Sequence, residues 1–169
     1  MKLNQFLKYT SLLLIGLLAG NAFAFVIGMG PVMEKLSASS YIAFHQSMQR
    51  SFLSWTPLLC LVVVFKLSVH LIVMRRQWQR VEFFLVLFAM LCVADELVMT
   101  WTGNMPLNRV IHMWQFQGPP NDWESVRLQW LNLMYWRCAL LVAGFSFMIA
   151  SVLTKKTESP ILQDVSVAF

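Results

Sequence analysis

Five ionisable residues lie inside long apolar stretches of the sequence: Lys66, His70, Asp95, Glu96 and Arg137. An ionised side chain at bilayer depth costs at least ~2.5 kcal/mol, so such residues persist mainly where they are paired or functional. A guanidinium fork can satisfy two carboxylate oxygens at once. We therefore expect Arg137 to pair with Asp95 or Glu96. The pair would either fix the rotation and register of the helices or belong to a functional site, and both interpretations stay open.

Helical spacing places these residues at similar depth. Asp95 and Glu96 fall roughly 20 Å from the start of their apolar stretch, and Arg137 falls roughly 13 Å from the opposite end of its own stretch. Residues spaced four, three, four and three share one helical face, and this face carries Trp123, Arg127, Trp130, Met134 and Arg137. A similar face carries Cys92, Asp95, Met99 and Thr102. The two faces predict a pocket below the connections on the outer side.

The remaining ionisable residues favour simpler roles. Lys66 and His70 lie one turn apart in the inner half of their stretch, where Lys66 can reach the interface or pair with Glu82 and His70 can lie at the interface. His45 and His112 both fall outside the stretches, at the expected mouth of the pocket. Two scattered histidines do not define a metal site, and the motifs of zinc proteases, nucleotide enzymes and covalently bound haem are absent from the sequence. We expect no metal and no resident cofactor.

Composition predicts the elements that position these residues. Of 169 residues, 58% are hydrophobic and 12% charged, far from the averages of soluble domains. Four apolar stretches, 9–31, 52–74, 81–102 and 128–153, approach or exceed the roughly 20 residues that span a hydrocarbon core. We predict an all-α, integral membrane four-helix bundle of up-down-up-down topology, with residues 1–153 as one domain and 154–169 as a tail.

Two long connections fall on the same side of this bundle. Residues 31–51 contain apolar positions at helical spacing, which predict an interfacial helix that caps the bundle. Residues 103–127 contain Gly-Asn, Met-Pro and Gly-Pro-Pro-Asn, which predict turns on both sides of a short helix near 107–115. Most of the tryptophans near this boundary are typical of an interfacial aromatic belt.

The first apolar stretch imitates a secretory signal peptide, because two lysines precede it and Ala22-Phe23-Ala24 resembles a cleavage site. The apolar run continues past that point, and small residues recur every fourth position at Gly16, Gly20, Ala24 and Gly28. This spacing predicts a groove for close helix packing, which a discarded peptide would not need. We therefore expect the helix to be retained.

Lysine and arginine predict the orientation. Residues before the first stretch, between the second and third, and after the fourth carry most of the basic side chains close to the apolar stretches, which assigns that side and both termini to the cytoplasm. We expect a multi-pass protein of a bacterial plasma membrane. The net charge of +5 then reflects topology, since no basic aromatic patch indicates nucleic-acid binding. Expected partners are membrane lipid and a small apolar aromatic ligand, and a homo-oligomer stays open.

A polar segment with the sequence T-G-N-M-P-L-N-R occupies 102–109. Asp122-Trp123, an R-x-x-W element from Arg127 to Trp130, and Arg137 follow it. This pattern resembles the anthrone oxygenase-like family of small four-helix membrane proteins, whose bacterial members mostly have no assigned function. The likeness extends from the small-residue first helix with its G-M-G-P at 28–31 to about Leu153.

The resemblance implies oxygenation of a small polycyclic phenol by dioxygen without metal or flavin. Such a substrate has an acidic C–H, so the protein needs a base, an anion stabiliser and a dry aromatic slot. Asp95, Glu96 or His45 could be the base, and Arg127 or Arg137 could stabilise the oxyanion. The substrate contacts would come from Asn104, Asn108, Trp123 and Trp130, with Met99 and Met134 on the facing stripes. The alternative is a non-catalytic membrane protein that binds a lipid, a quinone, a haem or a partner subunit.

Overall fold

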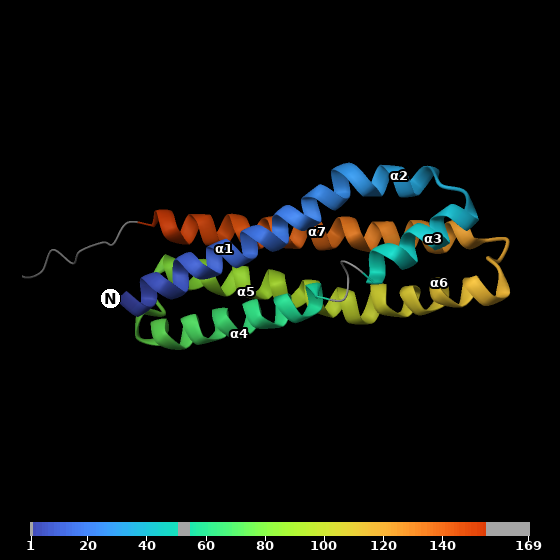
Figure 1. The fold of residues 1–169 in the computed structure, drawn as a ribbon. Helices are drawn as coiled ribbons and strands as arrows, with labels where there is room; N and C mark the ends of the chain where they lie inside the picture. The colour runs from blue at the N-terminus through green and yellow to red at the C-terminus, as the bar shows by residue number, and fades with distance from the viewer. Residues whose placement is uncertain (1, 51–54, 155–169) are drawn as a thin grey trace, which may run out of the picture.

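The computed structural model describes residues 2–50 and 55–154, and the regular elements in these ranges are all helical. Figure 1 shows the helices as long, roughly parallel rods. The helices are α1 (Lys2–Ala24), α2 (Gly30–Lys35), α3 (Ala38–Met48), α4 (Thr56–Met74), α5 (Val81–Met99), α6 (Met105–Gln117) and α7 (Trp123–Leu153). Residues 155–169, which make up nearly all of the expected tail, lie outside the described residues. The expected start of the second span, residue 52, lies outside them as well.

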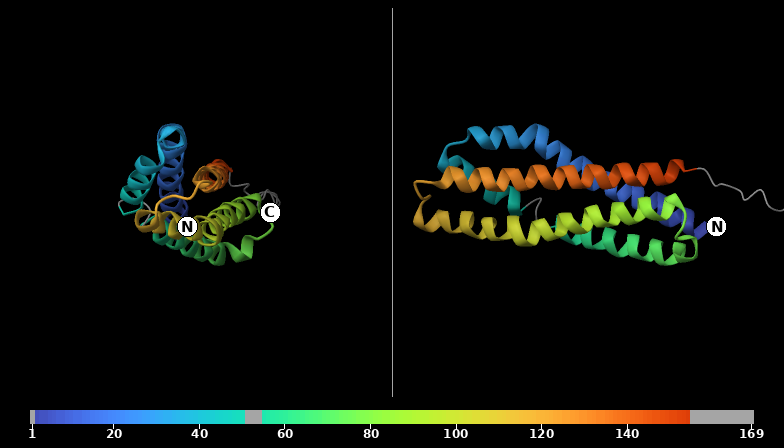
Figure 2. Two further views of the ribbon diagram at one scale, coloured as in Figure 1. Left: turned by 90° about the vertical axis from the view of Figure 1, so that its right-hand side faces the viewer. Right: turned by 180° about the vertical axis from the view of Figure 1, so that it is seen from behind.

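Within the described ranges, four continuous helical segments are long and apolar enough to cross a membrane: Leu3–Lys35, Thr56–Gln77, Val81–Gln117 and Trp123–Leu153. They alternate in direction along the bundle, with the starts of α1 and α5 and the ends of α4 and α7 at the same end (Figures 1 and 2). The predicted all-α membrane bundle of four helices is therefore confirmed.

Two of these segments pass through a proline without breaking. A π-helical turn at Phe25–Met29 joins α1 to α2 just before Pro31, and a second π-helical turn at Thr100–Asn104 joins α5 to α6 just before Pro106. Proline has no N–H and its ring clashes with the carbonyl four residues earlier. In each π turn a backbone N–H bonds to the carbonyl five residues earlier, which widens the helix where the ring must fit.

The segment 103–127 therefore begins differently from the prediction, which placed a turn before its helix. Gly103-Asn104 and Met105-Pro106 do not form a turn, because the π turn absorbs the proline and the helix continues to Gln117. The combined α5–α6 segment has 37 residues, or about 55 Å of helix, against a hydrocarbon core of about 30 Å. One end of the bundle thus extends beyond the membrane, where α3 packs against α6.

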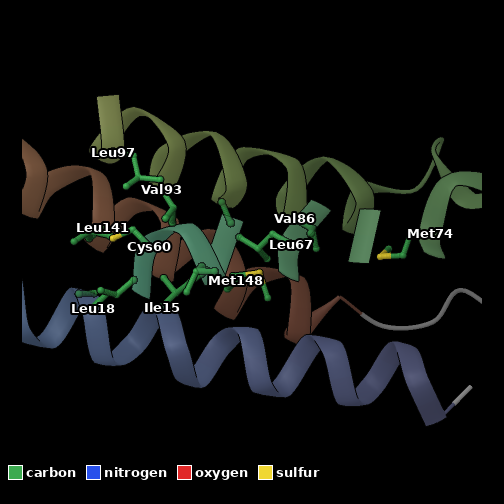
Figure 3. Close-up of a cluster of buried hydrophobic side chains, with 13 residues drawn as sticks. Ile15, Leu18, Cys60, Leu67, Met74, Val86, Val93, Leu97, Leu141 and Met148 are labelled. Atoms are coloured by element: carbon green, nitrogen blue, oxygen red, sulfur yellow. The ribbon is translucent and has the colours of Figure 1, made fainter. Parts of the chain in front are cut away.

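The interior contains two apolar cores. The membrane core lies among α1, α4, α5 and α7, and Figure 3 shows its side chains pointing into the space between these helices; it includes Ile15, Leu18, Cys60, Leu67, Val93, Leu97, Leu141 and Met148. The outer core joins α3, α6 and the first half of α7, and it includes Met33, Tyr41, Ile42, Ile111, Trp114, Trp130 and Met134. The predicted interfacial helix is α3, which covers this outer core.

The small-residue groove predicted on the first span is mostly not used inside the chain. A Cβ at Gly16 would lie 3.0 Å from the Phe145 ring, so α1 and α7 do approach closely there. Gly20, Ala24 and Gly28 are exposed, and a Cβ at either of the two glycines would meet nothing within 4 Å. The close packing expected at these three residues was therefore wrong within the chain, although α2 approaches α7 again at Gly30, where a Cβ would lie 3.1 Å from the Tyr135 hydroxyl oxygen.

Candidate functional site

A buried ion pair joins α5 to α7 between the two apolar cores. Arg137 Nε donates a hydrogen bond of 2.8 Å to Glu96 Oε1, and Arg137 Nη2 donates to the same oxygen. The side chains of Glu96 and Arg137 are only 1% and 5% exposed. Two opposite charges held this far from water require each other, because removing either would leave an uncompensated buried charge.

Close packing of α5 on α7 brings the pair together. Two turns beyond Arg137, a Cβ at Gly144 would lie 3.3 Å from Cys92 Cβ and 3.4 Å from the Ala89 carbonyl oxygen. The helices therefore approach each other at a position without a side chain. Glu96 lies one turn of α5 beyond Cys92, so this close approach sets the depth at which it meets Arg137.

The hydrogen bonds leave two polar atoms of the site unused. Thr100 Oγ1 donates a third bond to Glu96 Oε1, at 3.1 Å, and Arg137 Nη1 donates to Asn104 Oδ1 at 3.3 Å and contacts Met134 Sδ at 3.1 Å. Glu96 Oε2 and Asn104 Nδ2 are buried and have no hydrogen bond of regular geometry to a described residue, although the Cys60 thiol lies close to Glu96. Buried polar atoms are normally satisfied, so an acceptor and a donor left over at one centre mark it as a candidate site for a ligand's polar group.

Two cavities meet at Arg137. A polar cavity of about 280 Å³ opens towards the outer end, and its walls are Gln49, Pro57, Thr100, Asn104, Met105, Asn108, Trp130 and Arg137. An apolar cleft of about 80 Å³ lies on the other side, between α1, α3, α4 and α7, with Leu18, Phe25, Met134 and Leu141 among its walls. The guanidinium of Arg137 therefore borders both a polar and an apolar space.

A second set of side chains supports the polar cavity from behind. Trp130 Nε1 donates a 2.7 Å hydrogen bond to Asn108 Oδ1, and the His45 ring lies 5.0 Å from the Trp130 ring in an edge-to-face arrangement. His45 is fully buried and neither ring nitrogen has a hydrogen bond of normal geometry to a described residue. Burial lowers the pKa of His45 to about 4, although the nearby Asn108 amide offsets part of this effect. His45 is therefore neutral at pH 7.

Arg127 and Trp123 lie further out and tie the outer helices together. Arg127 Nη1 donates a 3.0 Å hydrogen bond to the Leu36 carbonyl, and its guanidinium lies 4.6 Å over the Trp123 ring. The Trp123 ring also contacts Tyr41 at 5.9 Å between centroids. Burial raises the pKa of Tyr41, with Arg127 acting against it. Neither Arg127 nor Trp123 lines the two cavities at Arg137.

The structure thus gathers part of the predicted set at one centre: Glu96, Arg137, Asn104, Asn108, Trp130 and Met134, with His45 behind Trp130. The predicted inward face of α7 is confirmed, because its members are buried or half-buried. The predicted face of α5 was wrong except at Cys92, which packs against Gly144. Asp95 and Thr102 are exposed and Met99 lines neither cavity, whereas the buried face carries Val93, Glu96, Leu97, Thr100 and Asn104.

Four cavity residues were missed in the sequence: Gln49, Pro57, Thr100 and Met105. Thr100 could have been found, because it lies four residues after Glu96 and so shares its helical face. Gln49 and Pro57 border a connection whose path cannot be read from helical spacing. Among the described residues, no group of three or more His, Cys, Asp or Glu side chains could hold a metal ion.

Comparison with known proteins extends these observations. No curated protein and no solved structure matches the chain. The family model described as anthrone oxygenase matches residues 36–147, more than half of the chain. The matched region runs from just before α3 into the second half of α7 and includes both members of the ion pair and all the residues that line the polar cavity. The chain therefore belongs to the anthrone oxygenase family.

Proposed function

We propose that the protein is a membrane-embedded oxygenase that uses dioxygen to convert an acidic CH₂ group of a small aromatic phenol, such as an anthrone, into a carbonyl. The observation that carries this proposal is the buried Glu96–Arg137 pair, in which Arg137 lines a polar cavity together with Asn104 and Glu96 Oε2 has no regular hydrogen bond. The family to which the chain belongs supports the reaction class.

The chemistry requires few protein groups. A base removes a proton from the CH₂ carbon, and the electron pair left behind is delocalised onto a ring oxygen, giving a phenolate-like anion. Its carbon adds to dioxygen, and protonation gives a hydroperoxide. Loss of the second C–H proton with cleavage of the O–O bond then forms the C=O group and releases water. One CH₂ group and one dioxygen therefore give one carbonyl and one water, with carbon oxidised and dioxygen reduced.

Arg137 is the group best placed to stabilise the anion, because its guanidinium borders the polar cavity and is held in place by Glu96. A preorganised donor of this kind contributes about 10²- to 10³-fold in rate. Asn104 Nδ2 provides a second donor at the same wall. Asn108 is less available, since its Oδ1 already accepts a bond from Trp130.

Two groups remain as the base. Glu96 concentrates its hydrogen bonds on Oε1, so Oε2 keeps free lone pairs for a proton. His45 is neutral at pH 7 with no regular hydrogen bond, and it lies behind Trp130. Neither candidate lines the polar cavity itself, but Glu96 is hydrogen-bonded to Thr100 and Arg137, which do, and we therefore favour Glu96. Asp95, the third candidate, is exposed on the other side of α5.

The two cavities at Arg137 suit an amphiphilic substrate. An apolar ring edge would enter the cleft beside Phe25 and Met134, while the ionising oxygen would face the polar cavity and Asn104. A compound of this kind partitions into the bilayer, so access from the lipid between the helices fits it better than access from water. The proposed substrate is accordingly a phenolic aromatic with little charge before reaction.

The proposed orientation follows the basic residues. Both termini and the turn between α4 and α5 would face the cytoplasm of a bacterium, the protein would lie in the plasma membrane, and the α3–α6 end would face outward. We propose residues 1–153 as one transmembrane domain with a cytoplasmic tail from 154.

The test is oxygen consumption by purified protein in detergent with anthrone added, measured above the rate of uncatalysed autoxidation. We expect one dioxygen consumed per quinone formed, and a loss of about 10²-fold or more in kcat for Arg137→Lys or Glu96→Gln. Arg109→Gln, an exposed arginine on the same outer end, is the control and should keep full activity. Anthrone binding without turnover would contradict the oxygenase and favour a non-catalytic binding protein.

A further inference from the structure

A second cavity lies at the opposite end of the bundle from the Glu96–Arg137 pair. Its volume is about 580 Å³, and it is enclosed by the start of α1, the end of α4, the turn before α5 and the end of α7. Its polar walls include Asn4, Lys8, Tyr9, Gln77, Arg80 and the carboxylate of Glu82. Nothing in the proposed oxygenase chemistry uses this cavity.

The charges around this cavity do not balance. Lys8 Nζ lies 2.5 Å from Glu82 Oε1 and donates a 3.1 Å hydrogen bond to the Ser151 carbonyl. Glu82 was predicted as a partner of Lys66, but Lys66 instead donates to Thr10 Oγ1 beside the Phe6 ring. Because Lys8 already compensates Glu82, a further positive charge on the cavity wall has no carboxylate left to balance it.

Arg80 supplies that further charge. It lines the cavity, it is exposed, and it forms no ion pair with a residue that the structure describes. An unbalanced guanidinium on a concave wall attracts an anion, and its planar fork matches the oxygens of a phosphate.

Hydrogen-bond donors stand around the same space. Asn4 Oδ1 forms a 2.7 Å hydrogen bond with Nε2 of the fully buried His70, so the amide of Asn4 is held in place with its Nδ2 donor not engaged by that bond. Tyr9 and Gln77 add a hydroxyl and an amide at the rim. The apolar part of the wall, with Val73, Met74 and Val152, lies where the membrane-crossing helices end.

We propose that this cavity binds a phosphate group, and specifically the phosphodiester of an anionic membrane phospholipid. Arg80 provides the unbalanced positive charge, while Lys8 offsets Glu82 on the same wall. Asn4 provides the oriented donor, and the apolar wall gives a path for the acyl chains. A free phosphate or a soluble phosphomonoester has the same acceptor chemistry but makes no use of the apolar wall. Juxtamembrane basic pockets between helices are suited to anionic lipids on these physical grounds.

Native mass spectrometry of the full-length protein in detergent tests the proposal, with phosphatidylglycerol, phosphatidylcholine and inorganic phosphate added separately. We expect phosphatidylglycerol to remain bound at lower concentration than phosphatidylcholine, and Arg80→Gln to weaken it about fivefold, since one basic residue near the surface contributes about 1 kcal/mol. Arg76→Gln is the matched control, because it removes the same charge at the same end from a residue outside the cavity wall. This control should change the affinity little.

Each outcome decides the proposal. Equal losses for Arg80→Gln and Arg76→Gln would indicate general attraction to the membrane and would overturn it. Equal binding of the two lipids by the unaltered protein would overturn it as well. Displacement of phosphatidylglycerol by inorganic phosphate at similar concentrations would keep the phosphate site but reject the lipid as its source. Thermal unfolding of both variants identifies any change in folding, which the exposed positions of Arg76 and Arg80 make unexpected.

Discussion

Glu96 and Arg137 are 41 residues apart in the chain, yet one carboxylate oxygen, Glu96 Oε1, accepts hydrogen bonds from both Nε and Nη2 of Arg137. The two carboxylate oxygens are used unequally, since Oε2 accepts no hydrogen bond of regular geometry from a described residue, although the Cys60 thiol lies close to Glu96. A purely structural pair would gain most from engaging both oxygens. An oxygen without a regular hydrogen bond suits a ligand site better than a pair that only fixes the helices, and the predictions below separate these two roles.

Replacing one member of the pair should lower stability more than replacing both. Glu96→Gln alone leaves Arg137 charged and buried, so we expect it to lower the free energy of unfolding by about 3–5 kcal/mol. The double variant Glu96→Leu with Arg137→Met replaces the pair by apolar groups and should recover most of this loss. Denaturant unfolding in detergent measures both. If the double variant unfolds as easily as the single one, charge compensation is not what holds α5 to α7.

The same double variant separates folding from function. It should be stable but inactive, because it has neither the free carboxylate oxygen nor the guanidinium. Oxygen consumption with anthrone at wild-type level in this variant would remove the ion pair from the proposed reaction.

Thr100 should matter and its neighbour Thr102 should not. Thr100 Oγ1 donates to Glu96 Oε1, whereas the exposed Thr102 Oγ1 donates to the Val98 carbonyl of its own helix. Thr100→Val removes a bond to a charged acceptor, so we expect a loss of about 1.5–3 kcal/mol in unfolding free energy. Thr102→Val should change the value by less than about 0.5 kcal/mol. Similar losses for the two variants would contradict the hydrogen-bond network around Glu96.

His45 should make the protein sensitive to mild acid. Its pKa is about 4 in the folded protein against 6.5 for an ordinary histidine, so the unfolded chain binds more protons between these values. The free energy of unfolding is therefore unaffected by the titration of His45 above pH 6.5, and it decreases as the pH falls from 6.5 towards 4. By pH 4.5 the loss should reach roughly 2–3 kcal/mol. Unfolding free energies of wild type and His45→Gln at pH 7.5 and 4.5 measure it.

The comparison with His45→Gln isolates one group from the carboxylates that also titrate in acid. The difference in unfolding free energy between wild type and His45→Gln should become smaller as the pH falls. His112→Gln is the control, because that side chain is exposed. A pH dependence that His45→Gln leaves unchanged would show that His45 is not held neutral by burial.

How much the sequence predicted depends on helical geometry. The four spans and the inward face of α7 followed from apolar runs and from the four-three spacing of Trp123 to Arg137, which a straight helix preserves. On α5, Asp95 and Glu96 are adjacent and project about 100° apart around the helix. Spacing alone favoured the face that carries Asp95, whereas Glu96 is the residue that faces Arg137. The packing of Gly144 against Cys92 sets that rotation, and it is a contact between distant segments.

The path beyond Thr100 was also not predictable from local signals. Gly103-Asn104 before Pro106 is ordinary turn chemistry in isolation. In the folded protein, Asn104 accepts a bond from Arg137 and a Cβ at Gly103 would lie 2.8 Å from Leu133 of α7. These contacts with α7 hold the segment helical through a π turn. The outcome depends on tertiary packing that a local pattern does not contain.

Gly144 offers the sharpest test of the contact that creates the site. Replacing glycine by alanine inside a helix is intrinsically favourable by about 1 kcal/mol. At Gly20 the added methyl would meet nothing within 4 Å, so Gly20→Ala should be neutral or stabilising. At Gly144 it would lie 3.3 Å from Cys92 Cβ and 3.4 Å from a backbone carbonyl, neither of which can rotate away. Gly144→Ala should therefore be less stable than Gly20→Ala by about 1–3 kcal/mol.

The same variant should weaken the site at a distance. If α5 moves from α7 by a few tenths of an ångström at Gly144, the hydrogen bonds from Arg137 to Glu96 lengthen although neither residue is changed. We expect Gly144→Ala to lower kcat with anthrone while Gly20→Ala keeps it, with denaturant unfolding as the parallel measurement. Equal stability and equal activity for the two variants would mean that the close approach at Gly144 does not position Glu96 against Arg137, and the account of how two distant helices assemble this centre would fail.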